Sequence, residues 1–104
     1  MRGNDLESIC WRVKRIREVF GDGKNQAEYA DLLGIGAKSW PSYENDERIS
    51  LNSALKVVMR HKEVTLNWIY LGDSRGMAFD VIRELEGKTA SPSIATKRGS
   101  GKRT

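Results

Sequence analysis

Few residues of this chain have the chemistry of a catalytic or metal site. Cys10 is the only cysteine and His61 the only histidine, which argues against a disulfide within the chain and against a zinc site. The sequence holds no paired acids, no Ser/His/Asp or Cys/His arrangement and no phosphate-binding loop. We therefore expect no enzyme, no cofactor and no metal. With catalysis and metal binding set aside, the residues that could bind a ligand by hydrogen bonds lie in a short segment near residue 40.

That segment runs from Ala37 to Asn45. At helical spacing Trp40 and Tyr43 share one face and must pack on a core, while the outer face carries Ala37, Lys38, Pro41, Ser42 and Asn45. Lys38 is the only long polar side chain of the outer face; it can reach a phosphate or guanine acceptors, whereas Ser42 can hydrogen-bond to almost any base. Pro41 disfavours helical geometry at Trp40, which leaves a late start, an irregular first turn or a bend open for this helix.

Two short helices around a tight turn must position this outer face. The first runs from about Asn25 to Leu33, with Asn25 as its N-cap and with Tyr29, Ala30 and Leu33 in the core. Gly34-Ile35-Gly36 ends it, and the second helix runs from about Ala37 to Asn45. Two helices around a short turn with glycine are the helix-turn-helix signature, whose second helix can enter the DNA major groove.

The remaining periodicity predicts helices on both sides of this unit. A first helix, capped by Asn4, buries a stripe from Leu6 to Phe20, with Arg12, Lys14 and Arg15 mostly off the stripe. Further helices are expected near Leu51–His61, capped by Ser50; over Leu66–Leu71, capped by Thr65 and ended by Gly72; and from Asp73 or Ser74 to about Glu86. Trp68 belongs to the core. Because no strand-period alternation occurs, we predict an all-α fold.

This pattern divides the chain into three parts. Residues 1–73 form a compact five-helix domain, residues 74–86 form an additional helix, and residues 87–104 form a disordered basic tail. The net charge is +4, but residues 1–86 hold 13 basic and 14 acidic side chains, so the basic character comes from the tail. A DNA-binding face in the body must therefore come from the arrangement of charges. With neither a membrane-spanning run nor a signal peptide, we expect a cytoplasmic protein.

The motifs from Arg12 to Gly72 resemble the Xre or Cro/lambda-repressor-like helix-turn-helix family. The matching pieces, in chain order, are Arg12-Val13-Lys14 with Arg17, Asn25-Gln26-Ala27-Glu28-Tyr29-Ala30 with Leu33-Gly34-Ile35, Tyr43-Glu44-Asn45, and Val64 to Asp73. The resemblance covers about six tenths of the chain. It implies the five-helix bundle of phage repressors and bacterial regulators, double-stranded DNA as partner, and a bacterial or phage-encoded, nucleoid-associated protein.

The resemblance also implies roles for single residues. Gln26 matches a position that contacts a phosphate and supports the recognition helix. Arg17 and Glu44 match a structural ion pair that ties the first helix to the end of the third. The base-facing positions are Ala37, Lys38 and Ser42, and the backbone-contacting positions are Gly36 and Asn45. Against the pattern, Asp46 and Glu47 occupy a loop that usually carries glycine and a basic residue, and acids there repel phosphate.

Two functions follow. The leading one is a transcriptional regulator, a repressor that binds a palindromic operator as a homodimer, because one helix-turn-helix offers few contacts. Its candidate dimer surface is the fifth helix with Met77–Leu85, where apolar residues exceed the needs of a five-helix core; Trp11 is a weaker candidate. The alternative is an antitoxin or other protein-interaction module, in which residues 74–104 wrap a toxin or another partner.

Overall fold

A computed structural model describes residues 4–90 of the chain, and the side chains of residues 4–87. This part folds into six helices, in chain order α1 (Leu6–Phe20), α2 (Gln26–Leu33), α3 (Ser39–Asn45), α4 (Leu51–Arg60), α5 (Leu66–Leu71) and α6 (Phe79–Ala90). No strand occurs among the described residues. The predicted all-α fold, with a sixth helix after the first five, is confirmed.

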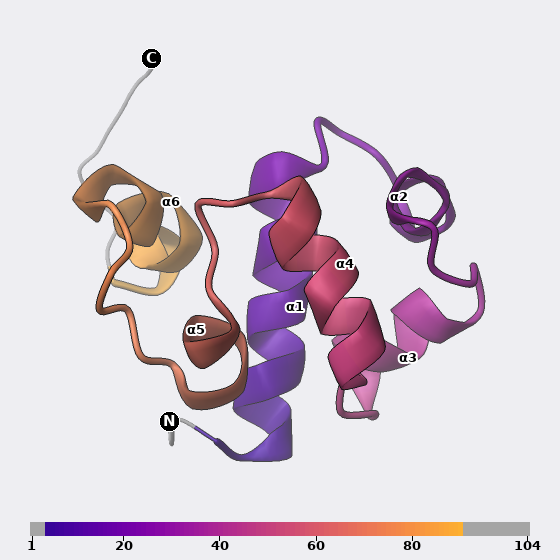
Figure 1. Cartoon of the computed structure of the whole chain (residues 1–104), viewed down its shortest axis with the longest axis horizontal. Helices are drawn as coiled ribbons and strands as arrows, with labels where there is room; N and C mark the ends of the chain where they lie inside the picture. Colours follow the sequence, from indigo (N-terminus) through magenta and orange to yellow (C-terminus); the bar gives the residue numbers. More distant parts are fainter. Residues whose placement is uncertain (1–3, 91–104) are drawn as a thin grey trace.

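The helices are arranged around α1, which runs through the middle of the molecule (Figure 1). The pair α2 and α3 lies on one side of it, and α5 and α6 lie on the other. Contacts join α1 to α3, α5 and α6, and α4 to α2 and α5. None of the helices in the described part is long and apolar enough to cross a membrane.

The core is built around large aromatic side chains from α2, α3 and α5. Trp40, Trp68 and Tyr29 are all fully buried, and the Trp40 ring packs edge-on against Tyr29 at 5.2 Å between centroids. The other residues assigned to the core from the sequence, Ala30, Leu33 and Tyr43, are buried as well. Aromatic residues bury the largest areas per side chain, so these rings fix how the helix-turn-helix sits on α1.

Helix ends follow the expected caps with one exception. Asn25 and Glu28 form a reciprocal capping box at the start of α2, and the Ser50 and Thr65 side chains cap α4 and α5. At the start of α1 the prediction was wrong by one residue: Asp5, with φ −78° and ψ 159°, is the N-cap in place of Asn4. The N-cap is the last residue with extended backbone before the helix, and here that residue is Asp5.

The start of α3 also differs from the prediction. The helix begins at Ser39, two residues after Ala37, and Pro41 is its third residue. Proline has no N–H to donate to the Ala37 carbonyl, so the regular ladder starts later. The Trp40 N–H still bonds the Gly36 carbonyl at 3.2 Å. Of the outcomes left open for Pro41, a late start is the one observed.

The sixth helix starts and ends later than predicted. It begins at Phe79 because the chain first makes a turn, in which the Met77 N–H bonds the Ser74 carbonyl at 3.1 Å and Gly76 takes φ 87°. It ends at Ala90, so residues 87–90 of the segment predicted to be disordered are helical. The rest of that predicted tail, 91–104, lies outside the described residues.

The sixth helix packs on the same core as the other five helices, with contacts to α1. Leu85 is fully buried in the core cluster. The buried Arg15 donates to the Leu85 carbonyl at 2.7 Å and the Glu84 carbonyl at 2.6 Å, and the Trp68 indole N–H donates to Glu86 at 2.7 Å. Much of the apolar surplus that suggested a dimer surface is therefore buried within one chain.

Candidate nucleic-acid interface

The helix-turn-helix is held together at one carboxylate, Glu44 of α3. Its oxygens accept hydrogen bonds from Arg17 of α1 at 2.6 and 3.2 Å, from the Gln26 amide of α2 at 2.9 Å, and from the Trp40 indole at 2.5 Å. The Glu44 side chain is 4% exposed. The Arg17–Glu44 ion pair expected from the sequence is present, and it belongs to a larger network that fixes α2 and α3 against α1.

For two donors of this network the partner was not predicted from the sequence. The resemblance gave Gln26 a phosphate contact and support of the recognition helix without naming Glu44, and Trp40 was assigned to the core alone. The spacing of Trp40 and Glu44 is a signal that was available, because residues four apart on a helix are neighbours on its surface. No local signal places Gln26 against Glu44, since 18 residues separate them.

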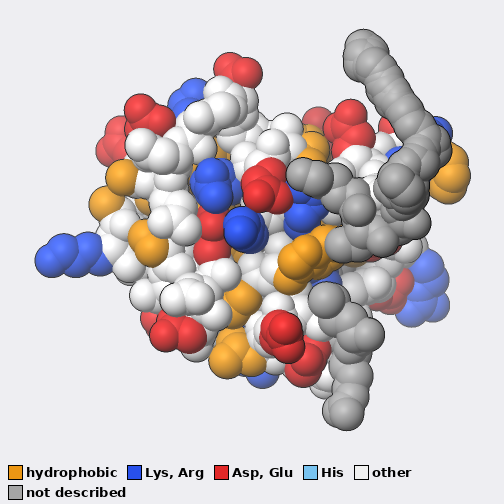
Figure 2. All heavy atoms as spheres, turned by 180° about the vertical axis from the view of Figure 1, so that it is seen from behind, with side chains coloured by type: hydrophobic (Ala, Val, Ile, Leu, Met, Phe, Trp, Pro, Cys, Tyr) orange, Lys and Arg blue, Asp and Glu red, His pale blue; other side chains and the backbone are white. Residues whose placement is uncertain are grey.

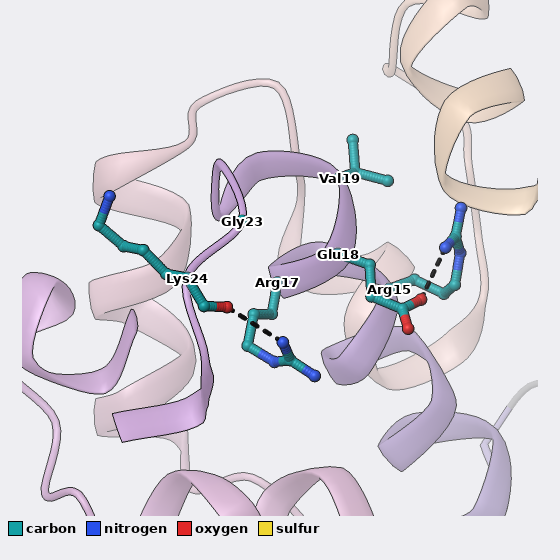
Figure 3. A pocket seen from close by; sticks show the side chains of 6 residues that line it. All are labelled: Arg15, Arg17, Glu18, Val19, Gly23 and Lys24. Atoms are coloured by element: carbon teal, nitrogen blue, oxygen red, sulfur yellow. Dashed lines mark hydrogen bonds and ion pairs between the residues drawn. The ribbon is translucent and has the colours of Figure 1, made fainter. Parts of the chain in front are cut away.

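The Arg17–Glu44 ion pair also changes the pKa of Arg17. The hydrogen bonds that Arg17 donates to Glu44 raise the pKa of Arg17, while burial of the guanidinium opposes that rise. Arg17 additionally donates to the Lys24 carbonyl at 3.2 Å, which ties the loop before α2 to α1 (Figure 3). Arg17 therefore remains charged, and its donors are directed inward to the scaffold.

The residues expected to face DNA lie on a short stretch of chain. Gly36, Ala37 and Lys38 are exposed in the turn that precedes α3, and Asn45 is exposed at the end of α3. Ser42 and Gln26 are half-buried. Because α3 begins at Ser39, Ala37 and Lys38 lie just before the helix and not on its outer face as predicted. Ser42 and Asn45, three residues apart, share one face of α3.

A lysine from α4 fixes the turn between α2 and α3. The Lys56 ammonium donates to the Gly34 carbonyl at 2.8 Å, at a helix end whose carbonyls need donors. Gly34 takes the left-handed conformation with φ 76°. Ile35, which follows it, is buried. No local sequence signal points to Lys56, because its partner is 22 residues away.

The loop after α3 presents two acids to solvent, and two side chains from α1 and α5 bond its backbone. Asp46 and Glu47 are both exposed. The Cys10 thiol donates to the Glu47 carbonyl at 3.6 Å, and the Tyr70 hydroxyl donates to the Ile49 carbonyl at 2.7 Å. Burial raises the pKa of Cys10, which keeps it a packing residue and weak donor. The two exposed acids follow directly after the end of α3.

A shallow hollow of about 450 Å³ lies between the end of α1 and the loop before α2 (Figure 3). Its lining residues are Arg15, Arg17, Glu18, Val19, Gly23 and Lys24. Arg15 pairs with Glu18 at 2.7 Å, and the Lys24 side chain points away from Arg17. The two arginines are engaged by the protein itself, so the hollow offers little to an anion. In the described part of the chain, no group of three or more His, Cys, Asp or Glu residues is placed to hold a metal ion.

The wider surface carries both signs of charge. On the face seen in Figure 2, Lys and Arg side chains alternate with Asp and Glu side chains. This agrees with the near balance of charges in residues 1–86, and it leaves any attraction for phosphate to local positions such as Lys38. No family model matches this chain, and no solved structure matches it significantly.

Proposed function

We propose that this protein is a sequence-specific DNA-binding regulator of transcription that places α3 in the major groove of double-stranded DNA. The observation that carries the proposal is the Glu44 network. It locks α2 and α3 against α1 through Arg17, Gln26 and Trp40, while the turn before α3 and the end of α3 stay exposed. A pair of helices that is held firmly and has an exposed outer surface is what major-groove reading requires.

Each residue then has a chemical task. Lys38 donates to a phosphate or to guanine, Ala37 makes apolar contact with a thymine methyl, and Ser42 adds a hydrogen bond of low specificity. A glutamine amide has two N–H donors. Gln26 gives one to Glu44 and keeps the other for a phosphate at the start of α2, where backbone amides also favour an anion. Gly36 and Asn45 lie against the DNA backbone.

We further propose that the protein acts as a repressor and binds as a homodimer to a palindromic operator. A single short α3 makes few contacts, so two half-sites are needed for specificity. With Trp68 and Leu85 buried within the chain, the dimer surface proposed on α5 and α6 narrows to Leu71 and Phe79, which are 53% and 70% exposed. The five basic residues after Glu86 add salt-dependent, non-specific affinity.

The test combines selection and titration. Bound sequences are selected from random duplex DNA, and the selected site is titrated by fluorescence anisotropy over a range of salt. We expect a site with two-fold symmetry and an affinity that falls with salt. Lys38→Ala combined with Gln26→Ala should weaken binding on the order of tenfold or more, and Lys38→Ala alone should reduce the salt slope by about one. Lys14→Ala, at an exposed lysine of α1, is the matched control.

Two results would contradict the proposal. One is an affinity that does not change with salt, and the other is full affinity in the Lys38→Ala, Gln26→Ala double variant. The second candidate, a protein-interaction module such as an antitoxin, is favoured by one observation, the exposed acids Asp46 and Glu47 beside α3. A random-DNA selection that enriches no sequence would favour that candidate.

A further inference from the structure

Helix α4 carries an apolar ridge that nothing in the described part of the chain covers. Leu51, Leu55 and Met59 are 58%, 39% and 71% exposed. They are spaced four residues apart, which places them in one row along the helix. The core side of α4 is formed by other residues, namely Ser53, Ala54 and Val57, which are buried. The ridge is therefore additional to the face that holds α4 in the fold.

Along the chain, the charged residues that flank this ridge are all basic. From Arg48 to Lys62 the sequence contains no acidic residue, and Arg48, Lys56, Arg60 and Lys62 are all exposed. Lys56 already donates to the Gly34 carbonyl, which leaves three of the four side chains for an outside partner. Acids return only at Glu47 and Glu63, directly outside this stretch.

We propose that the α4 ridge binds an amphipathic helix of another protein, whose apolar stripe is flanked by aspartate and glutamate. Rows of side chains spaced four apart pack into the matching grooves of a second helix, and the flanking acids pair with Arg48, Arg60 and Lys62. The inference does not rest on DNA binding, because it uses α4 side chains and not those of α3.

Charge also argues against other occupants from this chain. Two copies packed ridge to ridge would bring their cationic flanks together. The segment after residue 90 carries Lys97, Arg98, Lys102 and Arg103 without an acid, so it is repelled as well. An anionic membrane fits less well, because the ridge has no aromatic side chain of the kind that anchors interfacial helices.

The small area of the ridge limits how stable the complex can be. Three partly exposed side chains are a small area beside the roughly 800 Å² that each partner gives to a standard stable interface. We expect a transient contact in which charge supplies much of the selectivity.

The experiment uses the full chain labelled with ¹³C at the methionine methyl groups. The probe is a helical peptide with leucines spaced three and four apart and glutamates on both flanks. A peptide with lysines in place of the glutamates and a scrambled acidic peptide are the controls. The Met59 methyl resonance should shift on titration with the acidic helix, while that of the half-buried Met77 stays in place. The lysine peptide should bind at least about tenfold more weakly, because it loses several exposed ion pairs that the acidic peptide makes.

Variants then test the location. Leu55→Gln combined with Met59→Gln should abolish the interaction, monitored by anisotropy of the labelled peptide; both residues are exposed enough for the fold to tolerate the change. Arg60→Glu should weaken it and should bind the lysine peptide more tightly than the wild type does. Binding that survives the double variant, or equal affinity for the two charged peptides, overturns the proposal. The proposal is also overturned if the full chain self-associates or binds anionic vesicles and the double variant does not. Either result would identify a different occupant of the ridge.

Discussion

The indole N–H of Trp40 donates to the carboxylate of Glu44 at 2.5 Å, one helical turn further along α3. Trp40 is therefore both the largest side chain under the helix-turn-helix and a partner of the carboxylate that binds Arg17 and Gln26. Packing and hydrogen bonding act on the same point, so α3 has little freedom to rotate on the core. Substitutions at Glu44 should therefore lower the stability of the fold and alter the orientation of α3.

Glu44→Gln should be among the most destabilising conservative changes in this protein. It leaves the Arg17 guanidinium, whose side chain is 18% exposed, without its counter-charge, and breaking a buried pair costs about 3 kcal/mol. Urea unfolding followed by tryptophan fluorescence measures it. The matched control is Glu18→Gln: Glu18 also pairs with an arginine, Arg15, but is 36% exposed, so its loss should cost less than about 1 kcal/mol. Equal effects of the two variants would show that the Glu44 network is no stronger than a surface pair.

Gly72→Ala should destabilise the fold more than Gly23→Ala. Both glycines have positive φ, 73° and 78°, so both variants carry a backbone cost of about 1 kcal/mol. At Gly72 an added Cβ would also lie 3.1 Å from the Arg12 guanidinium, whereas at Gly23 it meets nothing within 4 Å. Arg12 donates to the Ile69 carbonyl at 2.8 Å, and displacing it loosens α5 from α1. Thermal unfolding of the two variants side by side gives the difference; a Gly23 variant that is as unstable as the Gly72 variant would contradict this account.

The features that were predicted correctly depend on neighbours in sequence. The N-cap at Asn25 and the glycine that ends α2 at Gly34 are each decided within about one helical turn. The apolar stripe of α1 follows from its spacing, except that Leu6 at its start is 41% exposed. Burial of Trp40 and Trp68 follows from size and periodicity. Errors arose where one residue changed the local hydrogen bonding: Pro41 delays α3 to Ser39, and the turn at Gly76 delays α6 to Phe79.

Contacts between distant residues were not predictable from the pattern. Arg12 and Arg15 lie off the apolar stripe of α1, where arginine is normally exposed, yet they are 4% and 6% exposed. Their donors satisfy backbone carbonyls of α5 and α6, more than 50 residues away. In the candidate site, the Arg17–Glu44 pair came from a family resemblance, while Gln26–Glu44 and Lys56–Gly34 became visible only once the helices were placed.

The stability of the fold should fall as the pH falls below about neutrality, because of His61. Its ring stacks on Phe20 at 4.9 Å and on Tyr29 at 5.9 Å between centroids. Burial lowers its pKa below the ordinary 6.5, with Glu63 opposing and Arg60 adding to the shift. The unfolded chain then binds a proton more readily than the folded chain, so stability is fully present above pH 6.5. It declines from there toward the lower folded pKa.

The measurement is the free energy of unfolding between pH 5 and 8, compared with His61→Phe. This variant keeps an aromatic ring against Phe20 and Tyr29 but cannot titrate. The difference in the free energy of unfolding between wild type and variant should change with pH only below about 7. In that range the wild type should lose stability relative to the variant as the pH falls. A difference that stays constant over the whole range would remove His61 as the cause.

Neutralising the acids after α3 should tighten DNA binding if the proposed function is right. Asp46 and Glu47 are exposed beside the end of α3, so in the proposed placement of α3 their charges lie close to the DNA backbone and repel its phosphates. Asp46→Asn with Glu47→Gln should raise the affinity several-fold at low salt, because exposed charge pairs contribute up to about 1 kcal/mol each, and the gain should shrink as salt screens the charges. Asp80→Asn, at an exposed acid of α6, controls for net charge and should have a much smaller effect. If the control raises the affinity as much as the double variant does, these acids lie away from the DNA and the proposed placement of α3 is wrong.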